Sequence, residues 1–282
     1  MDWLKQWNSA LDYIEGNLAS EIELETLGRL AGCSPYHFQR MFSYIAGVPL
    51  REYLRRRRMT RAAMDLQQGD KVLDVALRYG YESPTAFNRA FQSIHGLPPS
   101  MAQKEGTRLK SYPRIRFKFV LKGDTEMEYQ IVNRPAFRIV GVRMPLPVDA
   151  EDSFAQVPGF WAENAHRIPD ICALMDGTLP GLLGVSTCHR ERYDYYYIAA
   201  ATQAAVPEGL YAEEVPACTW AVFSGSGPMP QSIQELQKRI VAEWLPDSGY
   251  EWAQAPDVEV YLSRPGEPEN RYQVWLPVVK KQ

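Results

Sequence analysis

The chain has 282 residues and a formal net charge of −3, enough length for two domains with a core each. No stretch of 18 apolar residues occurs and no charged, apolar leader opens the sequence, so we expect a cytoplasmic protein that does not cross a membrane. The net charge hides an asymmetry: residues 1–110 hold 15 Lys and Arg against 12 Asp and Glu, a net charge of +3, whereas residues 111–282 have a net charge of −6. The basic part is the candidate for contact with nucleic acid.

A sixteen-residue pattern, Ser-Pro-x-x-Phe-x-Arg-x-Phe-x-x-Ile-x-Gly-x-Pro, occurs twice, at residues 34–49 and 83–98. Each copy begins with a serine that can cap a helix and a proline suited to the first helical position, and ends with a glycine that can adopt the left-handed conformation. Each copy therefore predicts a helix. Phe and Ile recur within it at i, i+4 and i+7, which indicates a buried stripe of Phe38, Phe42 and Ile45 in one copy and of Phe87, Phe91 and Ile94 in the other.

A short amphipathic segment precedes each copy, residues 24–31 and 73–80, at the same spacing of 49 residues. With a turn at 32–33 or 81–82, each segment and the helix after it predict a helix-turn-helix, whose second helix lies in the major groove of DNA. The alternative is a plain helical bundle, but a bundle does not need Arg and amide side chains at matching outward positions. Those positions hold Tyr36, Gln39, Arg40 and Ser43 in the first copy and Thr85, Asn88, Arg89 and Gln92 in the second.

Four sequence strings extend this interpretation: HFQRMF at 37–42, YLRRRRMT at 53–60, VALRYGYES at 75–83 and FNRAF at 87–91. In these strings the chain up to about residue 105 resembles the double helix-turn-helix module of AraC/XylS-family transcription regulators of the Rob-like type. The resemblance implies binding to double-stranded promoter DNA, and RNA polymerase as a partner. Since one chain carries two recognition helices, we expect a monomer on DNA. By motif position, the implied DNA contacts are Tyr36, His37, Gln39, Arg40, Thr85, Asn88 and Arg89.

A run of arginines, Arg55 to Arg58 together with Arg61, lies on a long predicted helix, residues 50–68. Such a run is often a solvated face, although one or two of these side chains could reach phosphates. The four cysteines and four histidines form no cluster at metal-ligand spacing. Cys188 and His189 are adjacent but make a weak candidate, so we expect no metal, no cofactor, no disulfide framework and no catalytic residue.

Beyond the first module, the sequence pattern changes from helical spacing to the alternating pattern of strands. We assign residues 1–106 to the DNA-binding domain, 107–126 to a basic linker and 127–282 to a second domain. In the second domain, the order strand, helix, strand, strand occurs twice, and Pro-Ala at 135–136 and 216–217 marks equivalent places. The expected fold is therefore multidomain: an all-α double helix-turn-helix domain, then an α+β domain of two β-α-β-β repeats with a groove between them. The expected strands are 129–144, 184–189, 193–201, 217–224, 257–263 and 272–279, and the expected helices are 158–175 and 232–244.

The strings WLPDSGY at 244–250, VEVYL at 258–262 and VWLP at 274–277 resemble the gyrase-inhibitor-like (GyrI-like) effector-binding domain, over residues 127–279. This resemblance implies binding of a small-molecule effector, as in multidrug and stress regulators, and a ligand-binding role for Glu259. Glu259 lies in the middle of a short strand, and it shares a face with Asp257 and Tyr261 because alternate residues point the same way. A buried carboxylate favours a cationic or hydrogen-bond-donating ligand.

Aromatic residues are candidates for the wall of this ligand site, although most aromatics at strand spacing belong to a core. The candidates are Trp161, Tyr195, Tyr197, Tyr261 and Trp275, while Tyr196 turns away from its two neighbours. The predicted protein is a transcription regulator whose second domain binds a small amphipathic effector, cationic or neutral. Two alternatives stay open. One is a hydrolase that uses Glu259 with a tyrosine, and the other is a ligand-independent DNA-binding protein with protein partners.

Overall fold

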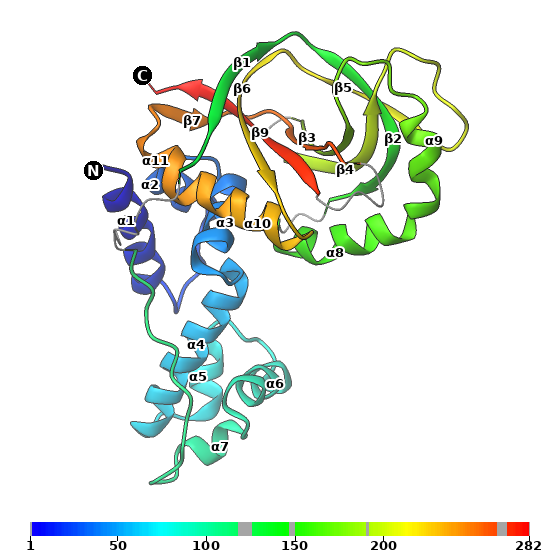
Figure 1. The fold of residues 1–282 in the computed structure, drawn as a ribbon. Coiled ribbons are helices and arrows are strands. Elements are labelled where there is room, and N and C mark those ends of the chain that lie inside the picture. Colours follow the sequence, from blue (N-terminus) through cyan, green and yellow to red (C-terminus); the bar gives the residue numbers. More distant parts are fainter. Residues whose placement is uncertain (1, 118–125, 147–149, 190–191, 264–269, 282) are drawn as a thin grey trace. The chain divides into compact units, whose positions relative to one another are not determined.

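The computed structural model describes residues 2–117, 126–146, 150–189, 192–263 and 270–281. The chain divides into two compact units, Met1–Val120 and Leu121–Gln282, which are described one at a time (Figure 1). Within the described ranges, no helix is long and apolar enough to span a membrane.

The first unit is helical, and its helices follow the duplicated pattern. Ser34 and Ser83 cap the two repeat helices, since each serine Oγ accepts the backbone N–H three residues on, at 3.2 and 3.4 Å. Gly47 and Gly96 end these helices in the left-handed conformation, with φ of 67° and 79°. The predicted boundaries are therefore confirmed. The helices are α1 (Asp2–Gly16), α2 (Leu24–Ala31), α3 (Pro35–Ala46), α4 (Leu50–Gln67), α5 (Val72–Arg78), α6 (Pro84–His95) and α7 (Pro99–Ala102).

The spacing of the two helix-turn-helix units differs by one residue from the sequence prediction. Gly32 after α2 and Gly80 after α5 both adopt the left-handed conformation, with φ of 73° and 80°. The next residue, Cys33 or Tyr81, donates its N–H to the carbonyl five residues earlier, at 2.9 Å in both units. The first helices therefore correspond at a spacing of 48 residues and the recognition helices at 49. The prediction that residues 73–80 match residues 24–31 is wrong by one position, because the second turn contains an extra residue.

The predicted stripe forms the core of the first unit. Phe38, Phe42, Phe87 and Phe91 are fully buried and Ile94 is nearly so, whereas Ile45 is only partly buried. Helix α1, which the duplicated pattern does not predict, completes this core. The ring of its Trp7 stacks on Phe38, with centroids 4.9 Å apart.

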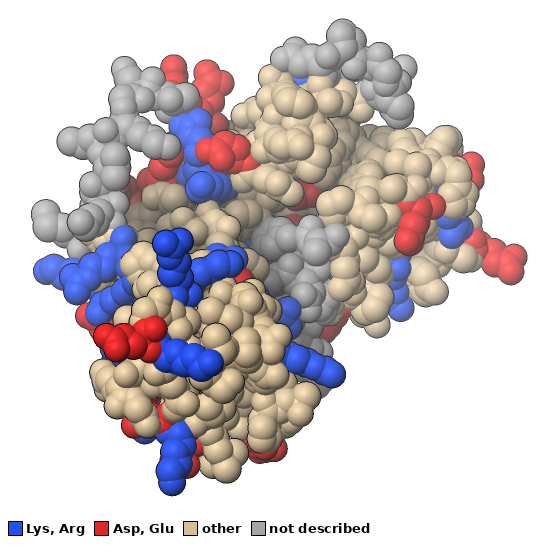
Figure 2. Space-filling model, turned by 90° about the horizontal axis from the view of Figure 1, so that it is seen from below, with Lys and Arg blue, Asp and Glu red and all other residues tan. Residues whose placement is uncertain are grey.

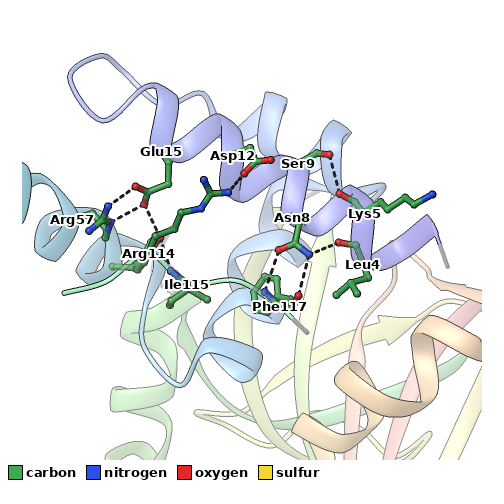
Figure 3. Close-up of polar contacts among 11 residues, drawn as sticks. Leu4, Lys5, Asn8, Ser9, Asp12, Glu15, Arg57, Arg114, Ile115 and Phe117 are labelled. Carbon is green, nitrogen blue, oxygen red and sulfur yellow. Dashed lines mark hydrogen bonds and ion pairs between the residues drawn. The ribbon is translucent and has the colours of Figure 1, made fainter. Parts of the chain in front are cut away.

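Residues 107–117, here called the strap, pack along the first unit as an extended segment (Figure 3). The strap contributes backbone N–H groups, and the acceptors are side chains of α1, α4 and α6. At 3.1–3.3 Å, Lys110 donates to His95, Tyr112 to Thr60, Ile115 to Tyr53 and Phe117 to Asn8. Arg114 adds an ion pair with Asp12. This part of the predicted linker is therefore anchored to α1, α4 and α6, and the following residues, 118–125, lie outside the described ranges.

The second unit is an antiparallel sheet in which the duplication is visible as symmetry. The strand order is β1-β6-β9-β8-β3-β4-β2-β5, with β7 beside β9. Read from its centre at the β8–β3 pair, each half runs β8-β9-β6-β1 or β3-β4-β2-β5. The strands are β1 (Tyr129–Arg134), β2 (Phe137–Pro145), β3 (Leu182–His189), β4 (Arg192–Ala201), β5 (Tyr211–Val215), β6 (Cys218–Ser226), β7 (Tyr250–Trp252), β8 (Asp257–Tyr261) and β9 (Arg271–Lys280).

The first predicted opening strand, residues 129–144, is divided in two at its Pro-Ala pair, and the second, residues 217–224, is preceded by an unpredicted strand on the other side of its Pro-Ala pair. Residues 135–136 separate β1 from β2, and residues 216–217 separate β5 from β6. The pieces then exchange partners, because β1 pairs with β6 of the other half and β5 pairs with β2. The break has a simple cause, since proline cannot donate to a strand ladder. Strands β5 and β7 were absent from the sequence prediction.

Helices α8 (Ala150–Glu163) and α10 (Gln231–Arg239) lie along the same side of the sheet (Figure 1). The first predicted helix begins earlier than residue 158, at Ala150, and ends at Glu163, after which come a 3-10 turn (Ala165–Arg167) and α9 (Ile168–Cys172). The second continues beyond α10 as a π-helix (Ile240–Trp244) and the short α11 (Leu245–Asp247). The opposite side of the sheet carries an apolar cluster that includes Val258 and Val260.

Candidate DNA-binding surface and ligand site

The outer face of α6 presents the predicted DNA contacts to solvent. Thr85 and Arg89 are exposed, and Asn88 is partly exposed. The Asn88 side chain accepts a hydrogen bond from Gln92, four residues on, at 3.0 Å. Lys and Arg side chains are more widespread than Asp and Glu over the helical unit in Figure 2. This face combines a charged donor with amide and hydroxyl groups, which are the groups that read base edges.

The matching face of α3 is less open. Tyr36 and Gln39 are partly exposed, but Arg40 is only 8 % exposed and its guanidinium lies 5.9 Å from the ring of Tyr44. Contact of Arg40 with DNA therefore requires its long side chain to swing outward. His37 is 2 % exposed, and burial lowers its pKa to about 3, with the charge of Arg40 adding to the effect. The assignment of His37 as a surface contact is wrong, because His37 lies beside the buried stripe.

The arginine run on α4 is mostly engaged within the protein. Arg57 and Glu15 of α1 form a bidentate ion pair at 2.6–2.8 Å, and both side chains are about a tenth exposed. The ion pair holds the pKa of the Glu15 carboxyl below its usual range despite the opposing effect of burial. Arg55 and Arg56 share Glu52.

Arg58 donates to the carbonyls of Leu18 and Ser20, each at 3.0 Å, whereas Arg61 is exposed. The run therefore joins α4 to α1 and to the segment that follows α1, with Arg61 as the member most open to solvent.

In the second unit, hydrogen-bond donors converge on Glu259 of β8. Its Oε2 accepts from the hydroxyls of Tyr261 at 2.7 Å and Tyr196 at 3.2 Å, and its Oε1 accepts from the amide of Gln237 at 2.7 Å. The Trp161 indole N–H donates in turn to the Tyr196 hydroxyl at 2.9 Å. Strands β4 and β8 and helices α8 and α10 therefore each contribute one or more groups to a single polar network inside the domain.

Burial and the neighbouring Glu259 carboxylate raise the pKa values of the Tyr196 and Tyr261 hydroxyls well above their ordinary value. Both hydroxyls are therefore donors at neutral pH. The Trp161 ring meets Tyr261 edge to face, with centroids 4.8 Å apart. Gly184 of β3 lies beneath the network, and a side chain there would collide with the Tyr196 hydroxyl and come within 2.8 Å of the Glu259 carboxylate. We call Glu259, Tyr196, Tyr261, Gln237 and Trp161 the Glu259 site.

The structure brings together only some of the predicted ligand residues. Trp161 and Tyr261 lie in the Glu259 site. Tyr197 and Trp275 are 0 and 3 % exposed in the apolar cluster on the opposite side of the sheet, and Tyr195 packs against that cluster. The assignment of these three to the Glu259 site is wrong, because strand alternation points them away from Glu259.

Two residues of the site, and the glycine beneath it, were missed by the sequence prediction. Tyr196 was the residue that alternation turned the other way, so the signal existed but its side of the sheet was unknown. Gln237 interrupts the apolar stripe of α10, a pattern that indicates a buried polar partner. Gly184 carries no local signal, since its need arises only from its position opposite Glu259 on β8.

No group of three or more His, Cys, Asp or Glu side chains suited to a metal ion occurs among the residues that the structure describes. The side chains of Cys188 and His189, the weak candidate pair, lie outside that description. Cys33, Cys172 and Cys218 are free cysteines, and burial raises the pKa of each thiol.

Comparison with known proteins assigns both units. A family model described as a GyrI-like small molecule binding domain matches residues 127–279, and one described as a helix-turn-helix domain matches residues 27–105. The HTH-type transcriptional activator AarP of Providencia stuartii is 39% identical over 98 residues, which are 34% of this chain and 73% of AarP. This chain is an AraC-family transcription regulator with a GyrI-like domain.

Two further relatives agree. The multiple antibiotic resistance protein MarA of Escherichia coli is 40% identical over 93 residues, 33% of the regulator and 73% of MarA. The probable transcription factor PqrA of Proteus vulgaris is 36% identical over 103 residues, 36% of the regulator and 84% of PqrA. The predicted family and fold class are confirmed. The regulator binds DNA through its helix-turn-helix domain, and its second unit is a small-molecule-binding domain.

Proposed function

We propose that the regulator binds a small amphipathic effector, cationic or neutral, at the Glu259 site. The observation that carries this proposal is the partly buried carboxylate of Glu259 in a small-molecule-binding domain, bordered by the rings of Trp161, Tyr196 and Tyr261. Aromatic faces attract cations, and a carboxylate supplies the opposite charge. A cationic effector would therefore gain both the attraction to the aromatic rings and the attraction to the carboxylate at one site.

We also propose that the site senses its ligand without converting it. Hydrolysis needs a group that accepts a proton from water near neutral pH. In the hydrolase alternative the acceptor is the Glu259 carboxylate, but its two oxygens already accept from Tyr261, Tyr196 and Gln237, which leaves little capacity to bind and activate a water molecule. The relatives named above are transcription regulators, which supports the same conclusion.

Substitution of Glu259 by glutamine tests the effector proposal, because it keeps the shape and removes the charge. Cationic ligands should lose about tenfold or more in affinity and neutral ligands of similar size should change little, since hydrogen bonds to a charged group are about twice as strong as those to neutral groups. Calorimetry with matched ligand pairs measures both effects. The exposed Glu251→Gln is the control of equal charge change. Equal losses for both ligand classes would instead assign Glu259 to the fold.

On DNA, we propose that one chain contacts two successive major grooves through Tyr36, Gln39 and Arg40 on α3 and Thr85, Asn88 and Arg89 on α6. RNA polymerase is the proposed partner at the promoter. Support comes from the two capped recognition helices within one chain, which remove the need for a dimer. Native mass measurement on a minimal duplex of about 20 base pairs should give one chain per duplex. Two chains per duplex would overturn the monomer proposal.

A further inference from the structure

Helix α10 buries a glutamine in the middle of its apolar stripe. The side chains that face the sheet from α10 and the π-helix after it are Ile233, Gln237, Ile240 and Val241, with exposed fractions of 4, 8, 1 and 1 %. Gln237 occupies a position of this stripe at which an apolar residue is expected. A buried amide without a partner would destabilise the fold, so its partner explains its presence.

That partner is Oε1 of Glu259, which accepts from the Gln237 amide at 2.7 Å. The amide must turn its NH2 group toward the carboxylate, because an ionised carboxylate only accepts hydrogen bonds. With the hydroxyls of Tyr196 and Tyr261 on Oε2, at least three of the roughly four lone-pair positions of the carboxylate are occupied by neutral donors of the protein. The negative charge remains, while the capacity to accept further hydrogen bonds is small.

Two kinds of cation meet this carboxylate differently. A cation whose charge lies on a fully alkylated centre attracts the carboxylate without needing a lone pair. An ammonium ion gains most from N–H donation, and it has to displace a protein donor to obtain it.

We propose that Gln237 is a specificity-determining residue of the Glu259 site, which favours effectors with a positive charge that carries no N–H over effectors with ammonium N–H groups. This inference rests on the proposed function, since it assumes that effectors bind beside Glu259. Gln237 acts as an internal competitor for ammonium donors and leaves the charge of Glu259 available to alkylated cations.

The test compares two ligands of equal charge, the phenylpropyl-trimethylammonium ion and the phenylpropylammonium ion, by calorimetry on the full chain. Wild type should bind the trimethylammonium ion more tightly. Gln237→Met keeps the length of the side chain and removes the donor, so the affinity ratio should shift toward the ammonium ion by about tenfold. Gln234→Met is the matched control, because Gln234 is exposed on the same helix and its substitution should leave the ratio unchanged.

The outcomes separate this inference from the proposed function. If both ions bind in a Glu259-dependent manner and Gln237→Met leaves their ratio unchanged, the inference alone is overturned. If neither ion binds wild type, the cationic part of the proposed function fails and the inference fails with it. Gln237→Leu repeats the measurement if the methionine variant does not fold. Tighter binding of the ammonium ion by wild type would overturn the inference without any variant.

Discussion

The two proposed functional regions of this regulator display their side chains in opposite ways. On α6, Thr85, Asn88 and Arg89 are placed by the period of one capped helix, and they face solvent. At the Glu259 site, the groups come from β4, β8, α8 and α10, and they meet at one partly buried carboxylate. A surface that contacts a large, charged partner can be placed by a single helix. A site for a small molecule depends on the packing of several helices and strands. The two regions should therefore respond differently to substitution.

The largest expected effect is an exception to this contrast, because the DNA-binding domain also contains a mostly buried ion pair, Arg57 with Glu15. Arg57→Ala removes the charged partner of the mostly buried Glu15 and leaves it the Tyr53 hydroxyl as a neutral donor, which should lower the free energy of unfolding by about 3 kcal/mol. Urea unfolding followed by helical ellipticity measures the loss. Arg55→Ala on the same helix is the control, since Arg55 is partly exposed and its ion pair should contribute less than about 1 kcal/mol. Equal losses for both variants would contradict the structural role of Arg57.

The same comparison explains what could be predicted from the sequence. Helix caps, apolar spacing and turn glycines are local signals, so α2 to α6 were placed almost to the residue. The single error, the extra residue in the second turn, arose because residues 73–80 fit a helix as well as the true α5 does. The arginine run could not be resolved, since only the approach of α1 shows that Arg57 faces Glu15.

In the second unit, strand alternation showed that Glu259 and Tyr261 share a face of their strand. It could not show which residues of the other strands lie on the same side of the sheet. The side of the sheet to which β4 turns Tyr195 and Tyr197 depends on its pairing register with β3 and β2. A shift of one residue in the pairing of β4 would turn Tyr195 and Tyr197 toward Glu259 and Tyr196 away from it. The exchange of β1 and β5 between the halves was equally invisible, because strand partners far apart in sequence leave no local pattern.

A second prediction tests whether the exposed face of α6 contacts DNA bases. Arg89→Ala should weaken specific DNA binding by about 1–3 kcal/mol and relax the sequence preference of one half-site only, because a single base contact is lost. Footprinting and titration on variant half-sites measure this. Arg116→Ala removes the same charge from an exposed position on the strap and should leave sequence preference intact. Loss of affinity without change of preference would show that Arg89 contacts phosphate alone.

A third prediction examines the tertiary character of the ligand site. Gly184→Ala adds a methyl group where the Tyr196 hydroxyl and the Glu259 carboxylate approach β3, so the network must shift. Effector affinity should fall by about tenfold, which corresponds to about 1.4 kcal/mol. Gly159→Ala is the control in the same unit, since a side chain there meets nothing within 4 Å. Unchanged affinity in Gly184→Ala would show that the network adapts without cost to the ligand.

The smallest expected effect concerns the strap and its contact with α6. The Nδ1 of His95 on α6 accepts from the Lys110 N–H of the strap at 3.2 Å, and its Nε2 lies 3.1 Å from the carbonyl of Met59 on α4. Burial and the nearby charge of Lys110 lower the pKa of His95 below its ordinary value of 6.5, an effect that the bond to Met59 partly offsets. The unfolded chain therefore binds a proton at a higher pH than the folded chain. It follows that stability from this group is full above about pH 7 and is lost as the pH falls below 6.5.

The slope cannot exceed about 1.4 kcal/mol per pH unit for one group, and the loss begins as the pH falls below 6.5. His95→Gln can keep a donor and an acceptor but does not titrate, so the stability of this variant should depend less on pH in that range. The lowered carboxyl pKa values of Glu15 and Glu52 act below about pH 4.5, whereas the lowered pKa of buried His37 acts in the same range as that of His95 in wild type and variant alike, so the difference between the two proteins reports on His95. Urea unfolding at several pH values measures the difference between wild type and variant. An identical pH dependence in both would mean that the strap is held to α6 without a contribution from neutral His95.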